Sequence, residues 1–418
     1  MKSDWDTIIL GSGGGGFSLA LLLASKGFQV AIVEPVRRAP LPGHAEILQP
    51  SGIQILDRLG LLQAVLDEGA YPWHRVHFIR AAGEPLCTID YRRLPPPHKD
   101  ALIILPETLR NIFLRVVEAT PSIQMVRTEE TPTLLWKGDQ IVGVVADSHT
   151  LHAPIVVGAD GVFSRMREAM GVSTSVHTYA NGYFALALER PDTFCPDLRF
   201  YIGKGIFFAV MPGPQKKIYL LYQAPRSDQE RIRSRGIEAF KANICSLNSE
   251  IAEFMEGPLE GLQDWTEAPF LSARRVRCAR WTVGGGALLG DAAHAMNPHV
   301  AQGRNAAMAD AVVLSEVIET CFRQGGDFSP RALSGYEAWR RPEISAYQRL
   351  ADELTWLWES RFPPLVWARE RIFRTIHQDH ELHDKILTTT AGTKIAPFNL
   401  YDRWRALHLW GTVPSKSR

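Results

Sequence analysis

The chain has few cysteines. Its 418 residues include five, none of which forms a C-x-x-C pair: Cys87, Cys195, Cys245, Cys278 and Cys321. A sparse, odd-numbered and scattered set argues against a disulfide framework and against a zinc or iron–sulfur site, and it favours a reducing compartment. His294 and His299 have no further Cys or His at metal-ligand spacing, so we predict no metal site.

An excess of charge of either sign is also missing. Lys plus Arg number 46 and Asp plus Glu number 45, which gives a formal charge of +1. This balance argues against a nucleic-acid binder and against a long acidic tail. Apolar residues at 45% and charged residues at 22% are ordinary globular usage, so the chain can bury a large core.

No long hydrophobic run indicates a signal peptide or a transmembrane segment. The N-terminus has Asp4 and Asp6 where a signal peptide needs positive charge. The apolar run Leu19–Ala24 is far shorter than the roughly 20 residues of a spanning helix. We therefore expect a soluble cytoplasmic protein, and peripheral membrane contact stays open. The nucleophile motif G-x-S-x-G is absent too, which disfavours a serine hydrolase.

Two residue types are unevenly distributed. Glycine is ordinary in number at 33, yet five of the six residues from 11 to 16 are glycine. Six of the 11 tryptophans lie in the last 80 residues: Trp339, Trp356, Trp358, Trp367, Trp404 and Trp410. Late aromatic residues are usually core or interface. The alternative is that some of them roof a substrate cavity or meet a partner or membrane: Trp356, Phe362, Trp367 and Phe373.

The glycine cluster lies within a strand–helix–strand pattern. Thr7–Leu10 is a short apolar run of the kind found in buried parallel strands. Phe17–Ser25 is rich in Leu and Ala and predicts a helix, and Phe28–Val33 predicts a second strand that ends at Glu34. Between them, Gly11-Ser12-Gly13-Gly14-Gly15-Gly16 satisfies G-x-G-x-x-G. The pattern predicts a βαβ unit that binds a dinucleotide.

Each part of this motif has a physical role. Gly11 permits the tight turn, Gly13 lets the backbone approach a pyrophosphate, and Gly16 lets the helix pack against the strand. The helix N-terminus attracts the phosphates with its partial positive charge. Glu34, 21 residues beyond Gly13, can accept hydrogen bonds from both hydroxyls of an adenosine ribose. The motif alone does not separate FAD from NAD.

The pattern of elements changes along the rest of the chain. Helices are predicted over Ser51–Leu59, Glu107–Ala119, 228–256 and Asn305–Phe322. Short strand-like runs within 123–158 predict a β-meander, and 178–224 is strand-like again. The tail from 330 to about 383 is mostly helical, with breaks expected near Pro342 and at Pro363-Pro364.

Two later segments resemble motifs of a known enzyme family. Val157–Arg167 (VGADGVFSRMR) is similar to the D-G motif of the class A, single-component flavin monooxygenases, the flavoprotein aromatic hydroxylases. Leu289–Pro298 (LGDAAHAMNP), continued by QGRN and the helix containing Asp310, is similar to their G-D motif. With the glycine motif, the resemblance covers roughly residues 5–325. Segments 44–61 and 106–110 resemble the ubiquinone-hydroxylase, alkylquinolone-pathway and squalene-epoxidising branches.

This resemblance implies a fold and a domain organisation. The fold class is α/β, with a Rossmann-like FAD-binding domain interrupted by a β-sheet substrate domain and followed by a helical C-terminal part. The discontinuous FAD-binding domain is expected at 1–75, 100–177 and 273–325. The substrate-binding sheet domain is expected at 76–99 and 178–272, and the C-terminal helical region at 326–418.

The resemblance also implies contacts to FAD. Asp291 would accept from a ribityl hydroxyl, and Pro298 to Gly303 would pass close to the isoalloxazine ring. The following helix N-terminus would stabilise negative charge on the reduced flavin. Asp160, Gly161 and Arg167 would serve FAD and the nicotinamide cofactor. The full cofactor-binding set is Gly11, Ser12, Gly13, Gly14, Gly15, Gly16, Glu34, Arg110, Asp160, Gly161, Arg167, Asp291, Pro298, Ala301, Gln302, Gly303, Arg304 and Asn305.

Some of these residues also allow a simpler, structural interpretation. Arg110 could be a solvated helix charge, and Ser164 and Arg167 could cap a helix and form a surface ion pair. His294 is expected to be structural. A basic cluster before the G-D strand is either a solvated edge or a contact to the 2′-phosphate of NADPH: Arg274, Arg275, Arg277 and Arg280. The tryptophan motif of the related flavin halogenases is not found in its expected position.

Three residues depart from the family pattern. Pro35 follows Glu34 where many members have Arg, so a cationic contact on the adenosine side is in doubt. Ala301 stands where Gly is usual, and its methyl could tighten or tilt the flavin seat. Arg304 replaces an apolar residue and could either place positive charge near the flavin pyrimidine or point into solvent.

The function implied is that of an FAD-dependent monooxygenase. NADPH or NADH would reduce FAD, O2 would add, and the flavin hydroperoxide would hydroxylate or epoxidise a small, fairly apolar, aromatic, quinolone- or polyketide-like substrate. We name no acid–base residue and expect four residues to line the cavity: His44, Tyr201, Tyr219 and Tyr222. Two alternatives stay open, an FAD-dependent reductase, oxidase or cyclase without oxygen insertion, and a non-catalytic FAD-binding partner protein. The oligomeric state is left open.

Overall fold

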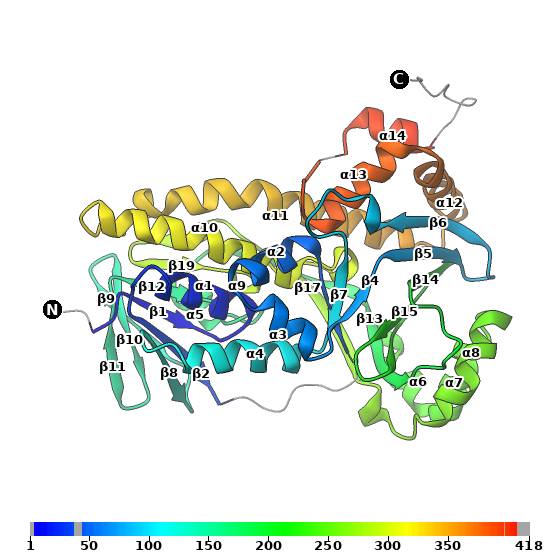
Figure 1. The fold of residues 1–418 in the computed structure, drawn as a ribbon, viewed down its shortest axis with the longest axis horizontal. Coiled ribbons are helices and arrows are strands. Elements are labelled where there is room, and N and C mark those ends of the chain that lie inside the picture. The colour runs from blue at the N-terminus through cyan, green and yellow to red at the C-terminus, as the bar shows by residue number, and fades with distance from the viewer. Residues whose placement is uncertain (1–3, 37–43, 397, 408–418) are drawn as a thin grey trace.

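A six-stranded sheet forms the centre of one half of the molecule (Figure 1). The computed structural model describes residues 4–36, 44–396 and 398–407. The strand order is β18-β19-β12-β1-β2-β8, and all neighbours are parallel except β18 and β19. The strands are β18 (Thr282–Val283), β19 (Gly286–Leu288), β12 (Ile155–Gly158), β1 (Thr7–Leu10), β2 (Val30–Pro35) and β8 (Ile123–Thr128). The predicted α/β class and βαβ unit are confirmed.

Helices cover this sheet on both sides. The first, α1 (Gly14–Ala24), packs against α10 (Gly303–Arg323) and α4 (Pro106–Glu118). It begins three residues before the predicted start at Phe17. Glycine in this first turn permits close packing: a Cβ on Gly15 would lie 3.0 Å from the carbonyl oxygen of Ala307 in α10 and 2.3 Å from Leu289 Cδ2.

The region 123–158 forms a meander only in its middle. There β9 (Thr133–Lys137), β10 (Gln140–Ala146) and β11 (His149–His152) pair antiparallel in the order β11-β10-β9. The flanking runs, β8 and β12, instead join the parallel sheet. Sequence alternation could not distinguish these two kinds of pairing, because each run is short and apolar.

A seven-stranded sheet forms the other half (Figure 1). Its order is β17-β13-β16-β15-β14-β5-β6, antiparallel except between β14 and β5. The strands are β17 (Phe270–Cys278), β13 (Thr174–Glu189), β16 (Lys217–Pro225), β15 (Ile206–Gly213), β14 (Leu198–Gly203), β5 (Arg75–Arg80) and β6 (Pro85–Asp90). One face packs against α7 (Ile237–Cys245) and α8 (Ser249–Glu260), which follow α6 (Gln229–Ser234). The other face turns toward the C-terminal helices.

A small three-stranded sheet joins the two halves. Its order is β3-β7-β4, with β3 (Glu46–Leu48), β7 (Ala101–Ile104) and β4 (Tyr71–Trp73). Helices α2 (Pro50–Arg58) and α3 (Leu62–Asp67) lie between β3 and β4 in the chain. The predicted helix near Ser51–Leu59 is confirmed as α2.

The C-terminal helices lie across the second sheet. They are α11 (Pro330–Trp358), α12 (Pro363–Gln378), α13 (His380–Ala391) and α14 (Leu400–Leu407). The break at Pro363-Pro364 is confirmed, but the expected break at Pro342 is wrong, since α11 continues through it. The helix is fixed on both sides of Pro342, because buried Tyr336, Ile344 and Tyr347 pack into the core of the first half. This burial outweighs the roughly 3 kcal/mol cost of an interior proline.

The late tryptophans do not form a core. Four are exposed, Trp339 by 72%, Trp356 by 62%, Trp367 by 56% and Trp404 by 50%, whereas Trp358 is only 3% exposed. Trp410 lies outside the described residues. Within the described chain, no helix combines the length and the apolar character that a membrane crossing requires.

Candidate cofactor and substrate site

The glycine turn between β1 and α1 leaves no room for side chains at two positions. Gly11 has φ +105°, and a Cβ there would lie 2.5 Å from the Ala159 carbonyl oxygen. A Cβ on Gly16 would lie 2.2 Å from the Gly11 carbonyl oxygen. Gly13, the N-cap of α1, borders open space instead. The N-terminus of α1 therefore presents bare backbone N–H groups to an open region, as a pyrophosphate site requires.

Glu34 and Arg110 both reach this turn. The Glu34 carboxylate is fully buried at the end of β2 and accepts a hydrogen bond from the Ser12 backbone N–H at 2.6 Å. Arg110, from α4, donates to the Ser12 hydroxyl at 3.3 Å, and its guanidinium carbon lies 5.8 Å from the centre of the Phe17 ring. Arg110 is thus fixed at the glycine turn and is not a solvated helix charge. Pro35 is exposed at the end of β2.

The D-G segment sits against the same turn. Asp160 Oδ2 accepts from the N–H groups of Arg165 at 2.8 Å and Met166 at 3.0 Å, at the start of α5 (Arg165–Ala169). Its Oδ1 is buried and has no hydrogen-bond partner among the described residues. Gly161, at φ +83°, borders open space. An unpaired carboxylate oxygen beside the glycine turn fits a ligand hydroxyl.

Arg167 has a different environment from the expected surface ion pair. Its side chain is buried and donates to the carbonyl oxygens of Ala292 at 2.8 Å and Val162 at 3.0 Å. It therefore ties the D-G segment to α9 (Asp291–His294), where the G-D motif lies. Ser164 does cap α5, since its hydroxyl oxygen accepts from the Arg167 backbone N–H at 3.0 Å.

Asp291 lies beside the N-terminus of α10. Its Oδ1 would be 4.0 Å from a Cβ built on Gly303, the first residue of that helix. The side chain is exposed, but surrounding protein reduces its hydration, and this desolvation raises the pKa of its carboxyl. The preceding Gly290 donates its N–H to Asp310 Oδ2 at 3.1 Å, which fixes the turn.

Asp310 is the centre of a buried charge cluster behind the G-D motif. It pairs with His294 Nε2 at 2.6 Å and with Arg340 Nε of α11 at 2.7 Å. Burial alone would raise the pKa of Asp310, but the charges and hydrogen bonds of these two partners hold it below its ordinary value. His294 is thus structural, as predicted.

The segment from Pro298 to Asn305 links the cofactor side to the rest of the molecule. Ala301 follows the short helix η4 (Pro298–Val300) with φ +49° and ψ +38°, so its methyl is accommodated in a left-handed conformation where Gly is favoured. Gln302 donates to the Thr390 carbonyl oxygen of α13 at 2.6 Å. Asn305 donates to the Ala301 carbonyl oxygen at 2.9 Å and accepts from the Gln49 N–H at 3.1 Å. Two separate parts of the chain, α13 and the residue before α2, therefore hold this segment.

Arg304 does not simply point into solvent, and its expected place near the flavin pyrimidine stays a prediction. It pairs with Glu46 of β3, and its guanidinium Nη1 would lie 3.1 Å from a Cβ built on Gly14. Its positive charge thus lies against the first turn of α1. Two of the four arginines before the G-D strand, Arg275 and Arg277, pair with Asp352 of α11.

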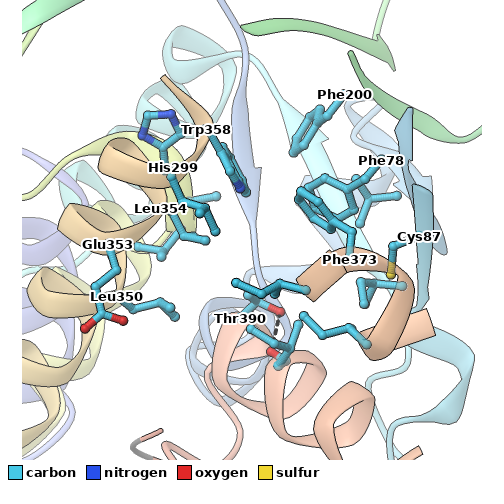
Figure 2. Close-up of a pocket in the computed structure, with 18 of the residues that line it drawn as sticks. Phe78, Cys87, Phe200, His299, Leu350, Glu353, Leu354, Trp358, Phe373 and Thr390 are labelled. Atoms are coloured by element: carbon cyan, nitrogen blue, oxygen red, sulfur yellow. Dashed lines mark hydrogen bonds between the residues drawn. The ribbon is translucent and has the colours of Figure 1, made fainter. Parts of the chain in front are cut away.

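A cavity of about 480 Å³ lies between the second sheet and the C-terminal helices (Figure 2). Phe78, Phe200 and Phe373 gather on one side of it, and Leu350, Leu354 and Trp358 of α11 lie on the other. Pro298, His299, Val300 and Ala301 also form part of its wall. The cavity therefore meets the segment that enters α10.

The cavity wall differs from the predicted one. Tyr201 and Tyr222 point to the opposite sheet face, in the core with α7 and α8, because side chains alternate along a strand. Their neighbours Phe200 and Leu221 line the cavity instead. Tyr219 shares the cavity-side face but packs against Gly213, and its hydroxyl lies 3.5 Å from the Pro214 carbonyl oxygen.

His44, half-buried, is not among the lining residues. Of the late aromatics, Trp356 and Phe373 do line the cavity, whereas Phe362 and Trp367 are exposed outside it. Most of the other lining residues were not predicted from the sequence, among them Gln49, Trp73, Tyr91, Tyr183 and His299. Only the position of His299 next to Pro298, within the segment expected near the flavin, could have indicated one of them.

His299 is the best-connected polar residue of the wall. Its Nδ1 contacts Asn297 Oδ1, which also accepts the His299 backbone N–H at 3.0 Å, and its Nε2 lies 3.3 Å from the Tyr183 hydroxyl. Because Asn297 Oδ1 is an acceptor, Nδ1 carries the proton and Nε2 accepts from Tyr183. Burial lowers the pKa of His299 to about 3, so the ring is neutral at physiological pH.

Glu359, at the C-terminus of α11, is a second group whose pKa is shifted. It accepts from Asn181 Nδ2 at 2.7 Å and from Gln223 Nε2 at 2.5 Å. Burial raises the pKa of the Glu359 carboxyl to about 7, and these two amide donors only partly oppose that rise. The carboxyl therefore changes charge near neutral pH.

The fold and this site together define a dinucleotide-binding oxidoreductase of the flavoprotein type. A family model described as FAD binding domain matches residues 4–351, and the chain belongs to this family. The 6-methylpretetramide 4-monooxygenase of Streptomyces rimosus is 30% identical over 350 residues, covering 82% of each chain. The 6-hydroxynicotinate 3-monooxygenase of Pseudomonas fluorescens is 26% identical, covering 84% of this chain and 91% of that one.

The solved structures agree on the fold. P. aeruginosa PqsL in complex with 2-aminobenzoylacetate superposes with a TM-score of 0.76 at 23% identity, covering 85% of this chain and 97% of PqsL. The p-nitrophenol 4-monooxygenase PnpA from Pseudomonas putida gives a TM-score of 0.77 at 18% identity, covering 94% and 100%. The resemblance to the FAD-dependent monooxygenases is confirmed.

Proposed function

We propose that this monooxygenase uses NAD(P)H and O2 to hydroxylate a fairly apolar aromatic substrate held in the 480 Å³ cavity. One observation carries the proposal: the cavity wall includes Pro298 to Ala301, the segment that leads into α10. A substrate in the cavity would thus lie next to the expected flavin seat. The names of the relatives, which act on 6-methylpretetramide and 6-hydroxynicotinate, support an aromatic substrate.

The residues around the glycine turn and at the start of α10 fit FAD. Glu34 would hold the adenosine ribose, the backbone at Gly13 would hold the pyrophosphate, and Asp291 would hold the ribityl chain. When bound, FAD supplies the redox chemistry, accepting a hydride from NAD(P)H and activating O2. The mainly apolar wall would limit the water around the substrate, and His299 would present a neutral ring there, whereas Glu353, Asp402 and Arg403 also border the cavity.

The two halves would divide this work. The parallel sheet with α1 and α10 would hold the cofactor, and the seven-stranded sheet would hold the substrate. The first half corresponds to the FAD-binding domain expected at 1–75, 100–177 and 273–325. The second corresponds to the substrate-binding domain expected at 76–99 and 178–272. The region 326–418 would not be a separate functional unit, because residues from α11 to α14 line the same cavity as the sheet.

The test is substrate-stimulated turnover. The purified protein should be yellow, and NADPH or NADH oxidation and O2 consumption should rise with members of a panel of phenols, quinolones and aromatic polyketides. Leu354→Trp, which fills the cavity, should abolish the stimulation and keep the flavin, whereas Leu66→Trp, on the surface of α3, should keep both. Bound flavin without NAD(P)H oxidation on any substrate would refute the proposed reaction, and a colourless protein that takes up no FAD would refute the cofactor assignment too.

A further inference from the structure

Three side chains that can ligate a metal converge at the second sheet, away from the cavity. His77 lies in β5, and Cys195 and Asp197 lie in the loop that leads into β14. One ligand atom from each of the three lies within 4.8 Å of the others. Strands β5 and β14 are parallel neighbours (Figure 1), and the register that pairs His77 with Arg199 brings the loop to the histidine.

The distances within this cluster suit a zinc ion. His77 Nε2 lies 3.2 Å from Asp197 Oδ2, and Cys195 Sγ lies 3.7 Å from the same oxygen. Zn²⁺ binds imidazole nitrogen and carboxylate oxygen at about 2.1 Å and thiolate sulfur at about 2.3 Å. In a tetrahedral site these bonds separate nitrogen from oxygen by about 3.4 Å and sulfur from oxygen by about 3.6 Å. Both observed distances are close to these values, and a water molecule can take the fourth position.

The histidine and the carboxylate are already held in place. His77 Nδ1 lies 2.9 Å from the hydroxyl of Thr88 in β6, the strand that pairs with β5 on its other side. Metal-binding histidines ordinarily use one ring nitrogen for the metal and the other for such an outer partner. The Asp197 side chain is only 5% exposed, so its position is fixed by packing. Little reorganisation is therefore needed before a metal binds.

Two arginines border the cluster. Arg75 pairs with Asp197 Oδ2 at 2.7 Å, and Arg199, which pairs with Glu250, also interacts with Cys195. A carboxylate has two oxygens, so Asp197 can bind a metal through one of them and keep Arg75 on the other. The positive charge of Arg199 favours the thiolate form of Cys195, which is the form that binds metals.

We propose that His77, Cys195 and Asp197 bind a zinc ion that ties the loop before β14 to β5. The sequence predicts no metal site because spacing rules compare residues that are close in the chain, whereas these ligands meet only through the sheet. The opposite face of the same two strands carries cavity residues, among them Phe78 and Phe200. The zinc ion would therefore fix part of the cavity wall from behind, and this role does not depend on the proposed reaction.

Zinc titration of the full-length, FAD-loaded protein tests the proposal, with a chromogenic chelator as competitor. After dialysis against a chelator, the native protein should bind one zinc ion. Outer partners contribute roughly 10–100-fold in affinity, so Thr88→Val should weaken binding about tenfold. Cys195→Ser, His77→Gln and Asp197→Asn each remove a ligand and should weaken it by at least about 100-fold. Arg75→Gln should tighten binding, because a cation that competes for Asp197 is removed.

Cobalt shows which atoms form the site. Co²⁺ in place of Zn²⁺ should give the intense red bands of a tetrahedral ion, at longer wavelengths than the flavin absorbs. A difference spectrum should also show the near-ultraviolet band of a cobalt–thiolate bond, which Cys195→Ser should remove. Two matched variants should leave zinc affinity and cobalt spectra unchanged: Cys245→Ser, at the other half-buried free cysteine, and His74→Gln, close to His77 in the chain.

Three results would overturn the proposal. They are a native protein that binds no zinc, a Cys195→Ser variant that binds zinc as tightly as the native protein, and weak cobalt bands typical of six-coordinate ions. Thermal unfolding keeps the test independent of misfolding: in excess chelator the native protein and Cys195→Ser should melt together, and zinc should raise the melting temperature of the native protein alone. Because no measurement uses turnover, an inactive protein that binds zinc in this way would keep the inference and lose the proposed reaction.

Discussion

Glu34→Gln is the sharpest test of the cofactor assignment. The carboxylate is fully buried, so water does not weaken its hydrogen bonds, and the substitution keeps its size. A hydrogen bond to a charged acceptor contributes about 1 kcal/mol more than one to a neutral acceptor. If both ribose hydroxyls donate to Glu34, the loss is about 2 kcal/mol, which corresponds to about 30-fold weaker FAD binding.

The stability of the FAD-free protein should change little on the Glu34→Gln substitution. The amide oxygen of Gln can still accept from the Ser12 N–H, now 2.6 Å from Glu34 Oε2, and a buried charge is removed. The free energy of unfolding without FAD should therefore change by no more than about 1 kcal/mol. Titration of the FAD-free protein with FAD, followed by flavin fluorescence, measures the FAD affinity. Thermal unfolding of the FAD-free protein measures its stability. Glu84→Gln, on the surface, is the control, and an FAD affinity of Glu34→Gln within threefold of the native value would refute the assignment.

Four further substitutions test the glycine turn, the shifted carboxyl and the proline of α11. A methyl group at Gly13 would enter open space, so Gly13→Ala should keep the melting temperature and lose FAD affinity. A methyl group at Gly16 would lie 2.2 Å from the Gly11 carbonyl oxygen, so Gly16→Ala should lower both. Equal behaviour of the two variants in thermal unfolding and FAD titration would contradict a pyrophosphate site at the glycine turn. Because the pKa of the Glu359 carboxyl is raised in the folded protein, its protonated form stabilises the fold. This stabilisation is fully present below about pH 4.5 and is lost as the pH rises through about 7. The loss is at most about 1.4 kcal/mol per pH unit, and solvent screening makes it smaller. Glu359→Gln should remove this slope in melting temperatures between pH 5 and 8, and an unchanged slope would exclude that carboxyl as its source. Pro342→Ala, exposed in the middle of α11, should stabilise the fold by about 2 kcal/mol in denaturant unfolding, and a loss of stability would show that the proline is needed there.

The features that the sequence could predict are those governed by local backbone geometry. Gly11 and Gly16 are needed because no side chain fits, and such a requirement is visible as a fixed spacing in the chain. Glu34 follows from the same register, since it closes the second strand of the βαβ unit. The structure brings all of these together with Arg110.

The cavity could not be predicted in the same way, because its walls depend on which sheet face is covered by distant helices. Phe200 lines the cavity and Tyr201 does not, although both fit one apolar strand. Likewise, Pro342 would end an isolated helix, but α11 continues through it because buried residues on both sides pack into the core. Trp73 and Trp358 line one cavity only because tertiary folding brings β4 and α11 to it, so no local pattern connects them.

The hydrogen bond from Gln302 to the Thr390 carbonyl oxygen has a consequence for synthesis. The second sheet is complete at Cys278, the end of β17, whereas α13 ends at Ala391. At the usual 5–20 residues per second, about 6 to 23 seconds separate the synthesis of these two residues. During this interval the aromatic face of the second sheet is made but lacks part of its helical cover, so the nascent chain exposes an apolar surface. A chain cut short before α13 would offer that surface to chaperones in place of a substrate.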